Sequence, residues 1–456
     1  MNNYKKTLFT IVISTIIFFF FLIILGEKVN YPLLLSLTIG LFFAILFLIK
    51  PKYCLFVFIF LIPFEDITII SQSLTLIKII GWLLLFIWLF TKIRNKKFPQ
   101  IDKTSFLLIL FFVWASLSFF WAYNPTVVLN RIPTFIQLLI LYVILTDMVK
   151  DRKTLHSVLW IYTFGTILAS LLTIFFFFSG EELIGTRAAI SSSGSPNHLP
   201  LSMIPAFMWL WINFSTSKVW KSKLINLILL LPIIGVIILS ASRGALLALF
   251  LTLMISLIWK NQRKQTFYLF FIGIMGYIFL NLINNPDIFS RFTVERFLYD
   301  RGAGRFDIWL VGLKMAKENF FIGVGLDNYP WVFGDYYAIT QTLRSISYFK
   351  ASHNIYLGVL VELGIVGIIL FLGFIIIKLL SIFNNIKPQL ISIINKNNNI
   401  SIPLTVLLSL VSLLIGGFFL DILYRKYFWI FLSLCTACNL INISNENSSE
   451  INKKIT

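Results

Sequence analysis

Four side chains sit in polar interruptions of a very apolar chain and could act on an anionic substrate: His353, Arg243, Arg305 and Arg187. Arginine suits phosphate recognition because its planar guanidinium stays charged and can donate two parallel hydrogen bonds. Histidine is the side chain best suited to move a proton near neutral pH. Together these residues predict a site for a lipid-linked diphosphate, at which the histidine serves an acceptor hydroxyl.

Each of these residues also has a simpler interpretation, which the sequence leaves open. Arg243 could extend to lipid headgroups or meet a carboxylate distant in sequence. Arg305 could pair with Asp307, two residues along the chain. His353 could merely begin a helix at the membrane interface, and Arg187 could form a local salt bridge in a surface loop.

The long polar segment that contains Arg305 is not strongly basic. Residues 287–352 hold eight Lys or Arg and seven Asp or Glu, so individual arginines would have to recognise the substrate. Arg291, Arg296 and Arg301 are further candidates, but Arg305 is favoured because it begins a predicted helix. We find no P-loop, no G-x-S-x-G motif and no cluster of histidines and carboxylates in the sequence. Neither a metal nor a cofactor is therefore expected.

Length and composition predict an all-α, polytopic integral membrane protein. Of 456 residues, 58% are hydrophobic and 12% are charged, which exceeds the apolar usage of soluble domains. Since each crossing needs about 20 apolar residues, the runs predict about 12 to 14 transmembrane helices. The predicted spans lie near 7–25, 32–49, 53–64, 75–90, 104–122, 127–146, 156–178, 199–215, 224–240, 244–259, 267–284, 354–377, 402–420 and 427–443. The first run lacks a cleavage site, so it is a span and not a signal peptide.

The net charge of +19 reflects membrane topology and not nucleic-acid binding. Basic clusters recur in every second loop, which places those loops in the cytoplasm by the positive-inside rule. The intervening loops then face outward, and they include 65–66, 181–197 and the long segment 287–352. Arg425 and Lys426 are the exception, because they fall in an outward loop.

An amphipathic helix is predicted over residues 305–318, where Phe306, Trp309, Leu310 and Leu313 recur at helical spacing. We expect it to lie on the outer surface of the membrane. Gly323-Val324-Gly325 then permits a tight turn. The aromatic residues that follow fit either anchoring at the interface or stacking on sugar rings. They are Tyr329, Trp331, Phe333, Tyr336 and Tyr337.

Several ordered motifs resemble the shared region of the O-antigen ligase and O-antigen polymerase family. They are Ser242-Arg243-Gly244, Gly304-Arg305 followed by Trp309, Gly323-Val324-Gly325, His353-Asn354, Glu362-Leu363-Gly364 and the late Phe428-Trp429. The resemblance covers residues 185–435. It implies a GT-C-like arrangement of three regions. N-terminal membrane helices occupy residues 1–180, and a catalytic region with an extracytoplasmic loop at 285–352 occupies residues 181–443. A polar cytoplasmic tail is expected at residues 444–456.

The resemblance further implies a membrane glycosyltransferase of the bacterial inner membrane whose active site faces the periplasm. Such enzymes transfer a glycan from undecaprenyl diphosphate to a sugar hydroxyl, without metal or cofactor. The acceptor is a lipid-linked glycan or lipid A-core, in exopolysaccharide or lipopolysaccharide biosynthesis. Arg243 and Arg305 match the arginines thought to bind the diphosphate, and His353 matches the essential histidine. The match of Arg187 is weaker.

Three alternatives remain at this point. Within the family, polymerase is favoured slightly over ligase, because the sequence shows no separate carboxy-terminal domain for a protein acceptor. Outside this family, the chain could be a lipid-linked oligosaccharide flippase or another polysaccharide transporter. Such proteins carry charged residues at membrane depth, whereas here the notable charged residues flank the predicted spans. A purely structural membrane partner would leave His353 and the arginines replaceable.

Overall fold

The computed structural model describes a large part of the chain. The described residues are 46–68, 75–96, 99, 102, 104–180, 183–184, 187–190, 195–259, 262–263, 293, 295, 299–340, 342, 345, 347–391 and 401–455. The spans predicted at 7–25 and 267–284, and most of the one at 32–49, lie outside these residues. So do Arg291 and Arg296.

The described chain is helical apart from one small hairpin, which confirms the predicted all-α class. Five described helices are long and apolar enough to cross a membrane: α4 (Leu76–Asn95), α6 (Pro125–Met148), α7 (Arg152–Ser179), α9 (Trp220–Leu239) and α16 (Ile355–Ile391, apolar through Ile386). Other described helices include α3 (Pro51–Leu61), η1 (Ile62–Phe64), α5 (Ser105–Leu117), α8 (His198–Thr216), α10 (Arg243–Ser256), α14 (Arg305–Glu318), α15 (Tyr329–Ala338), α17 (Ser401–Gly416) and α18 (Lys426–Ile455). The hairpin pairs β1 (Leu183–Ile184) with β2 (Arg187–Ala188).

The chain divides into two compact units. One comprises residues 1–58 and 78–98, and the other comprises residues 59–77 and 99–456. In the smaller unit Gly81 of α4 packs against the Phe58 ring of α3. The candidate site residues all belong to the larger unit, which is described below.

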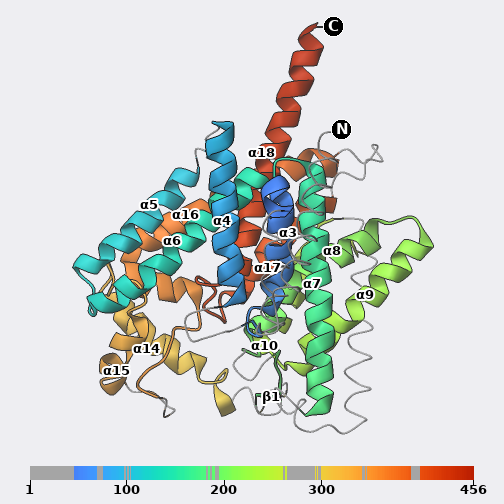
Figure 1. The fold of residues 1–456 in the computed structure, drawn as a ribbon. Coiled ribbons are helices and arrows are strands. Elements are labelled where there is room, and N and C mark those ends of the chain that lie inside the picture. The colour runs from blue at the N-terminus through green and yellow to red at the C-terminus, as the bar shows by residue number, and fades with distance from the viewer. Residues whose placement is uncertain are drawn as a thin grey trace, which may run out of the picture. The chain divides into compact units, whose positions relative to one another are not determined.

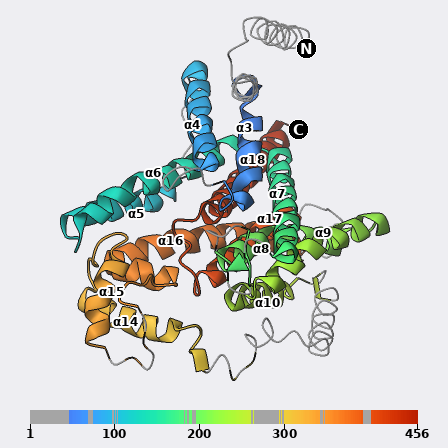
Figure 2. The same ribbon diagram turned by 60° about the horizontal axis from the view of Figure 1, so that its bottom comes forward.

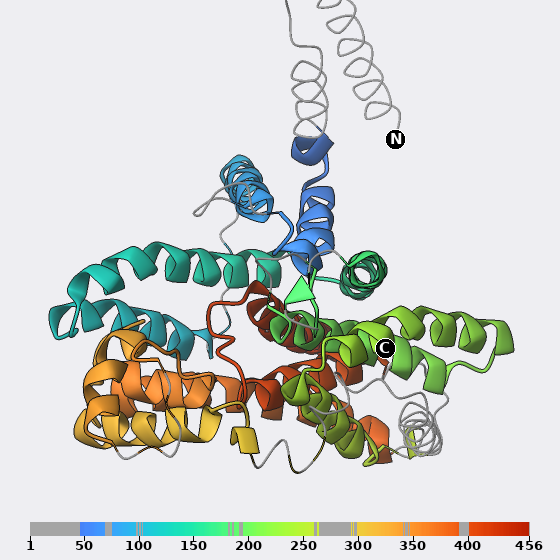
Figure 3. The same ribbon diagram turned by 90° about the horizontal axis from the view of Figure 1, so that it is seen from below.

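Helices α17 and α18 form the interior of the larger unit. Helix α17 contacts α8, α10, α16 and α18, while α18 also contacts α6 and α7. Helix α8 is buried along nearly its whole length, including Trp209 and Trp211. Helix α5 lies along α16, and α14 and α15 cover one end of α16 (Figures 1, 2 and 3).

Helix α16 is interrupted two turns after it begins. Gly364 has φ 65° and ψ −167°, a conformation open essentially to glycine alone. A break of this kind removes the intrahelical partners of the preceding carbonyl groups. Three donors from elsewhere replace those partners: Val324 N reaches Val361 O at 2.9 Å, Gly325 N reaches Glu362 O at 2.8 Å, and the Trp114 indole reaches Leu363 O at 2.9 Å.

The Gly323-Val324-Gly325 segment therefore pairs with the broken helix as a strand would. Added Cβ atoms would lie 2.4 Å from the Glu362 backbone at Gly323 and 2.4 Å from the Ala122 Cβ at Gly325. Because side chains would prevent this close approach, both glycines are needed for contact as well as for their positive φ angles. The tight turn predicted for this motif thus serves to join the long loop to α16.

The predicted helix over residues 305–318 is confirmed as α14, but its apolar stripe is not its main packing face. Ile308, Val311 and Met315 are buried against α15 and α16, whereas the predicted Phe306, Leu310 and Leu313 are exposed. Helix α14 is apolar on more than one side, so its tertiary neighbours decide which side is buried.

The aromatic residues of α15 also differ from their prediction. Tyr329 and Phe333 belong to the core beneath α14, where the Tyr329 hydroxyl donates to Ile308 O at 3.1 Å. They neither anchor at an interface nor present rings to a sugar. Trp331 is the exposed member of the set, at 48%.

Two observations concern the carboxy-terminal part of the chain. Cys435 and Cys438 of α18 are buried free thiols. The polar tail expected after residue 443 instead continues α18 to Ile455. Once a helix is nucleated by its packed apolar part, each further residue adds a hydrogen bond at little cost.

Replacing Gly364 by Ala should destabilise the fold. The new methyl group would lie 2.3 Å from Phe321 O, and the backbone strain alone costs about 1–3 kcal/mol. We expect a clear drop in the midpoint of thermal unfolding in detergent. Gly373→Ala in the same helix is the matched control, because nothing lies within 4 Å of its Cβ position. Equal midpoints for the two variants would contradict the role of the break.

Candidate functional site

His353 lies in the turn that leads into α16, and its backbone is held in an unusual conformation. Its φ is +47°, in the left-handed region that costs a residue other than glycine about 1–2 kcal/mol. Asn354 then caps the helix, since its side-chain oxygen accepts from Tyr356 N at 2.9 Å and from Leu357 N at 3.0 Å. The cap and the following helix therefore determine where the imidazole points.

Three of the predicted residues come together around one turn, Gly417 to Leu420, which follows α17. Ile355 N, two residues after His353, donates to Gly417 O at 2.8 Å. Gly244, next to Arg243, packs so closely on Phe419 that a Cβ would lie 2.9 Å from the Phe419 Cβ. Trp309, one helical turn after Arg305, has its ring 6.3 Å from that of Phe419. The helix starts that carry His353, Arg243 and Arg305 thus converge.

A second contact ties α14 directly to the histidine. The Trp309 indole donates to the carbonyl of Ser352, the residue before His353, at 3.1 Å. The charge of Arg305 also acts on His353. Burial, followed by the charges of Arg305 and Lys350, lowers the pKa of His353 to about 4. The imidazole is therefore neutral at pH 7 and can accept a hydrogen bond.

Arg243 has a carboxylate partner that is distant in sequence. Its Nη2 atom lies 2.8 Å from Asp300 Oδ2. The sequence left open whether Arg243 extends to lipid headgroups or meets a carboxylate distant in sequence, and the structure shows the carboxylate. Asp300 also accepts from Ala303 N at 2.9 Å, within the turn before α14. Asp307 pairs with Arg301 at 3.1 Å. The Arg243–Asp300 pair therefore joins the start of α10 to the turn that precedes Arg305.

Arg187 occupies a different environment from the other two arginines. Its Nε donates to Ser240 O at 2.7 Å, and its Nη2 donates to Asn197 Oδ1 at 2.6 Å and to Pro196 O at 3.3 Å. It therefore joins β2 to the end of α9 and to the turn before α8. This arrangement supports the hairpin that carries Arg243, because Ser240 is only three residues from it.

Sequence reasoning did not include His198 in the site. The structure places its Nδ1 3.1 Å from the Tyr427 hydroxyl, and the positive charges of Arg425 and Arg305 act on it. The available signal was weak: His198 ends one predicted outward loop and Arg425 lies in another. Nothing in the sequence says that these two loops meet.

A partly buried ion pair beside the α16 break was missed as well. Arg131 of α6 binds the Asp327 carboxylate at 2.6 and 2.7 Å, and Asp327 N donates to the Glu362 carboxylate at 2.9 Å. The Arg131 guanidinium also lies over the Tyr424 ring, 4.3 Å from its centre. This network joins α6 and the loop before α15 to the first part of α16.

Comparison with known families gives a match for residues 227–372, to the family described as O-antigen ligase. The match supports assignment to the O-antigen ligase/polymerase family. The matched region, about a third of the chain, contains Arg243, Arg305 and His353, as well as the glycine motif and the α16 break. Arg187 and His198 lie outside it. No curated protein matches the chain.

Arg187→Gln should act mainly on stability. The substitution leaves partly buried carbonyl groups without their donor, at a cost of about 1–3 kcal/mol. We expect a lower thermal midpoint in detergent than for the wild type, whereas Lys314→Gln, a change at a lysine with one contact to Ile339 O, should leave the midpoint unaltered. An unchanged midpoint for Arg187→Gln would contradict its structural role.

Proposed function

We propose that this protein is a membrane glycosyltransferase that transfers a glycan from undecaprenyl diphosphate to an acceptor sugar hydroxyl, without metal, as a surface-polysaccharide polymerase or an O-antigen ligase. The observation that carries the proposal is the convergence of Arg243, Arg305 and His353, all inside the family match, on the turn after α17. Two arginines beside one neutral histidine suit a diphosphate leaving group and a hydroxyl nucleophile.

The reaction would be a displacement at the anomeric carbon. The acceptor oxygen forms the new bond to that carbon while the bond to the diphosphate oxygen breaks. Arg243 and Arg305 stabilise the charge that grows on the departing diphosphate, and this help is larger in the transition state than in the ground state. The hydroxyl proton passes to His353 and from there to the product diphosphate or to water.

His353 would act late in this reaction because its low pKa makes it a weak base. As the acceptor oxygen bonds to carbon its proton becomes acidic, so a weak base suffices at that stage. The bound diphosphate also offsets the charge of Arg305 and so raises the histidine pKa in the complex. Binding of the donor would thus prepare the base.

We further propose that the site faces the periplasm from the bacterial inner membrane. The support is the alternation of basic loops, which leaves the segments with His353, Arg305 and Arg243 on the opposite side from the lysine-rich loops. The polyprenyl tail would lie among the membrane helices, with its diphosphate at their outer ends.

Transfer in reconstituted liposomes tests the proposal. The donor is undecaprenyl-diphosphate glycan, supplied with an acceptor glycan and a chelator, and the product is a new glycosidic bond. Attachment of the product to a second lipid-linked glycan would indicate a polymerase, and attachment to lipid A-core a ligase. Lipid movement across the bilayer without a new bond would identify a flippase and refute the proposal.

Two substitutions should abolish most of this activity while preserving the fold. Arg305→Gln should lower kcat/KM by about 10²–10³-fold, as expected for one preorganised charge-stabilising donor. His353→Asn should lower kcat by about 10²–10⁴-fold, and asparagine tolerates the left-handed backbone. Lys314→Gln serves as the control, with wild-type rates expected. Full activity of either folded site variant would contradict the assigned role.

The pH dependence should report the environment of His353. Because its pKa is lowered to about 4, the acid limb of kcat/KM should lie near pH 4 and not near the ordinary histidine value. Lys350→Gln removes a positive charge that disfavours protonation, so the pKa should rise and the limb should move to higher pH. An acid limb of kcat/KM that stays at the same pH in Lys350→Gln would argue against neutral His353 as the required form. An equal shift of the limb in the control Lys314→Gln would argue against it as well.

A further inference from the structure

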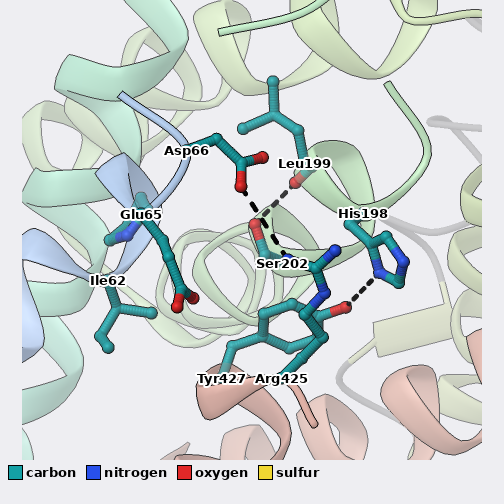
Figure 4. A pocket seen from close by; sticks show the side chains of 9 residues that line it. Ile62, Glu65, Asp66, His198, Leu199, Ser202, Arg425 and Tyr427 are labelled. Atoms are coloured by element: carbon teal, nitrogen blue, oxygen red, sulfur yellow. Dashed lines mark hydrogen bonds and ion pairs between the residues drawn. The ribbon is translucent and has the colours of Figure 1, made fainter. Parts of the chain in front are cut away.

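A small pocket between η1, the start of α8 and the start of α18 takes no part in the reaction proposed above (Figure 4). Its polar walls come from three segments: the turn after η1, the first turn of α8 and the start of α18. They are Glu65, Asp66, His198, Ser202, Arg425 and Tyr427. The space inside the pocket is about 20 Å³, which is enough for one water molecule or one hydroxyl group.

The first turn of α8, which carries the pocket residue His198, reaches the turn that receives the start of α16. Leu201 packs so closely on Gly416 that an added Cβ there would lie 2.3 Å from the Leu201 side chain. The neighbouring Gly417 O accepts from Ile355 N at 2.8 Å. A ligand group in the pocket would therefore belong to a molecule that also reaches the reacting centre.

The charges around the pocket balance. Lys426 pairs with Glu65, and Arg425 faces Asp66, so two cations meet two carboxylates. These pairs also account for the basic residues that broke the predicted charge alternation, because Arg425 and Lys426 are neutralised by the acidic turn after η1. A diphosphate would meet both carboxylates here and a metal ion would meet both cations. The balance favours a neutral polar ligand.

One of the two pairs is loose. Arg425 Nη1 lies 3.9 Å from Asp66 Oδ1, and Ser195 N lies 3.3 Å from Asp66 Oδ2, both longer than the roughly 2.7–2.9 Å of charge-assisted hydrogen bonds. A hydroxyl group can donate to the carboxylate and accept from the guanidinium at the same time. Burial raises the pKa of Asp66, so an added donor would stabilise its carboxylate.

We propose that this pocket is an acceptor subsite: a hydroxyl of the acceptor sugar bridges Asp66 and Arg425, and this holds the neighbouring hydroxyl at His353. The inference rests on the proposed glycosyl transfer and adds to it the place of the acceptor ring. Asp66 and Arg425 are then positioning residues that determine which hydroxyl is presented.

Asp66→Asn tests the subsite in the liposome assay, with a soluble oligosaccharide of one repeat unit as acceptor and undecaprenyl-diphosphate glycan as donor. Loss of one charge-assisted hydrogen bond should raise the acceptor KM by about 10- to 100-fold, with kcat and the donor KM little changed, because the lost contact exists before and during reaction. Asp335→Asn is the matched control at an exposed carboxylate bonded to Tyr123, and its kinetics should equal those of the wild type.

Ser202→Val provides a second variant that leaves every charge in place. It fills the pocket from the α8 side and should raise the acceptor KM in the same way. If Asp66→Asn lowers the thermal midpoint and so destabilises the fold, the acceptor KM of Ser202→Val tests the subsite in its place. An unchanged acceptor KM in the folded variants would overturn the subsite. A rise in the donor KM alone would also overturn it and would assign the pocket to the donor sugar. Failure of the wild type to form any glycosidic bond would instead refute the proposed function itself.

Discussion

The structure of the larger unit depends on how the carbonyl groups at the break in α16 are satisfied. Each buried carbonyl without a donor would cost about 1–3 kcal/mol, and the apolar surroundings offer no water to replace one. Val324 N, Gly325 N and the Trp114 indole supply the three donors. One set of hydrogen bonds thus anchors the long polar loop and joins α5 to α16.

Placement of the candidate site follows from this anchor. With the loop held at Val324 and Gly325, α14 packs on the first part of α16, and its Trp309 reaches back to Ser352. The turn after α17 then receives the beginnings of α10 and α16 together with the Trp309 ring. Helix starts suit an anionic substrate, since their backbone N–H groups and dipoles favour negative charge.

Electrostatics in this unit work through pairs between distant segments. Arg131 binds Asp327, Arg243 binds Asp300, and Lys426 binds Glu65. Each pair brings its cation into a partly buried position at a tolerable cost, because an unpaired buried charge would be far more expensive. The pairs therefore hold loops in place. They also leave the pocket beside His198 neutral overall, whereas the site around His353 contains arginines that can meet an anion.

The sequence by itself determined the helical membrane class, most described helix positions, the helix over 305–318 and the motifs that carry the family resemblance, because apolar run length and helical spacing are local properties. Tertiary structure alone decided which face of α14 is buried, that Tyr329 and Phe333 belong to the core, and that Asp300 is the partner of Arg243. It also brought His198, Asp66 and Arg425 together from three loops. Such contacts join residues far apart in the chain, and no local pattern specifies which loops meet.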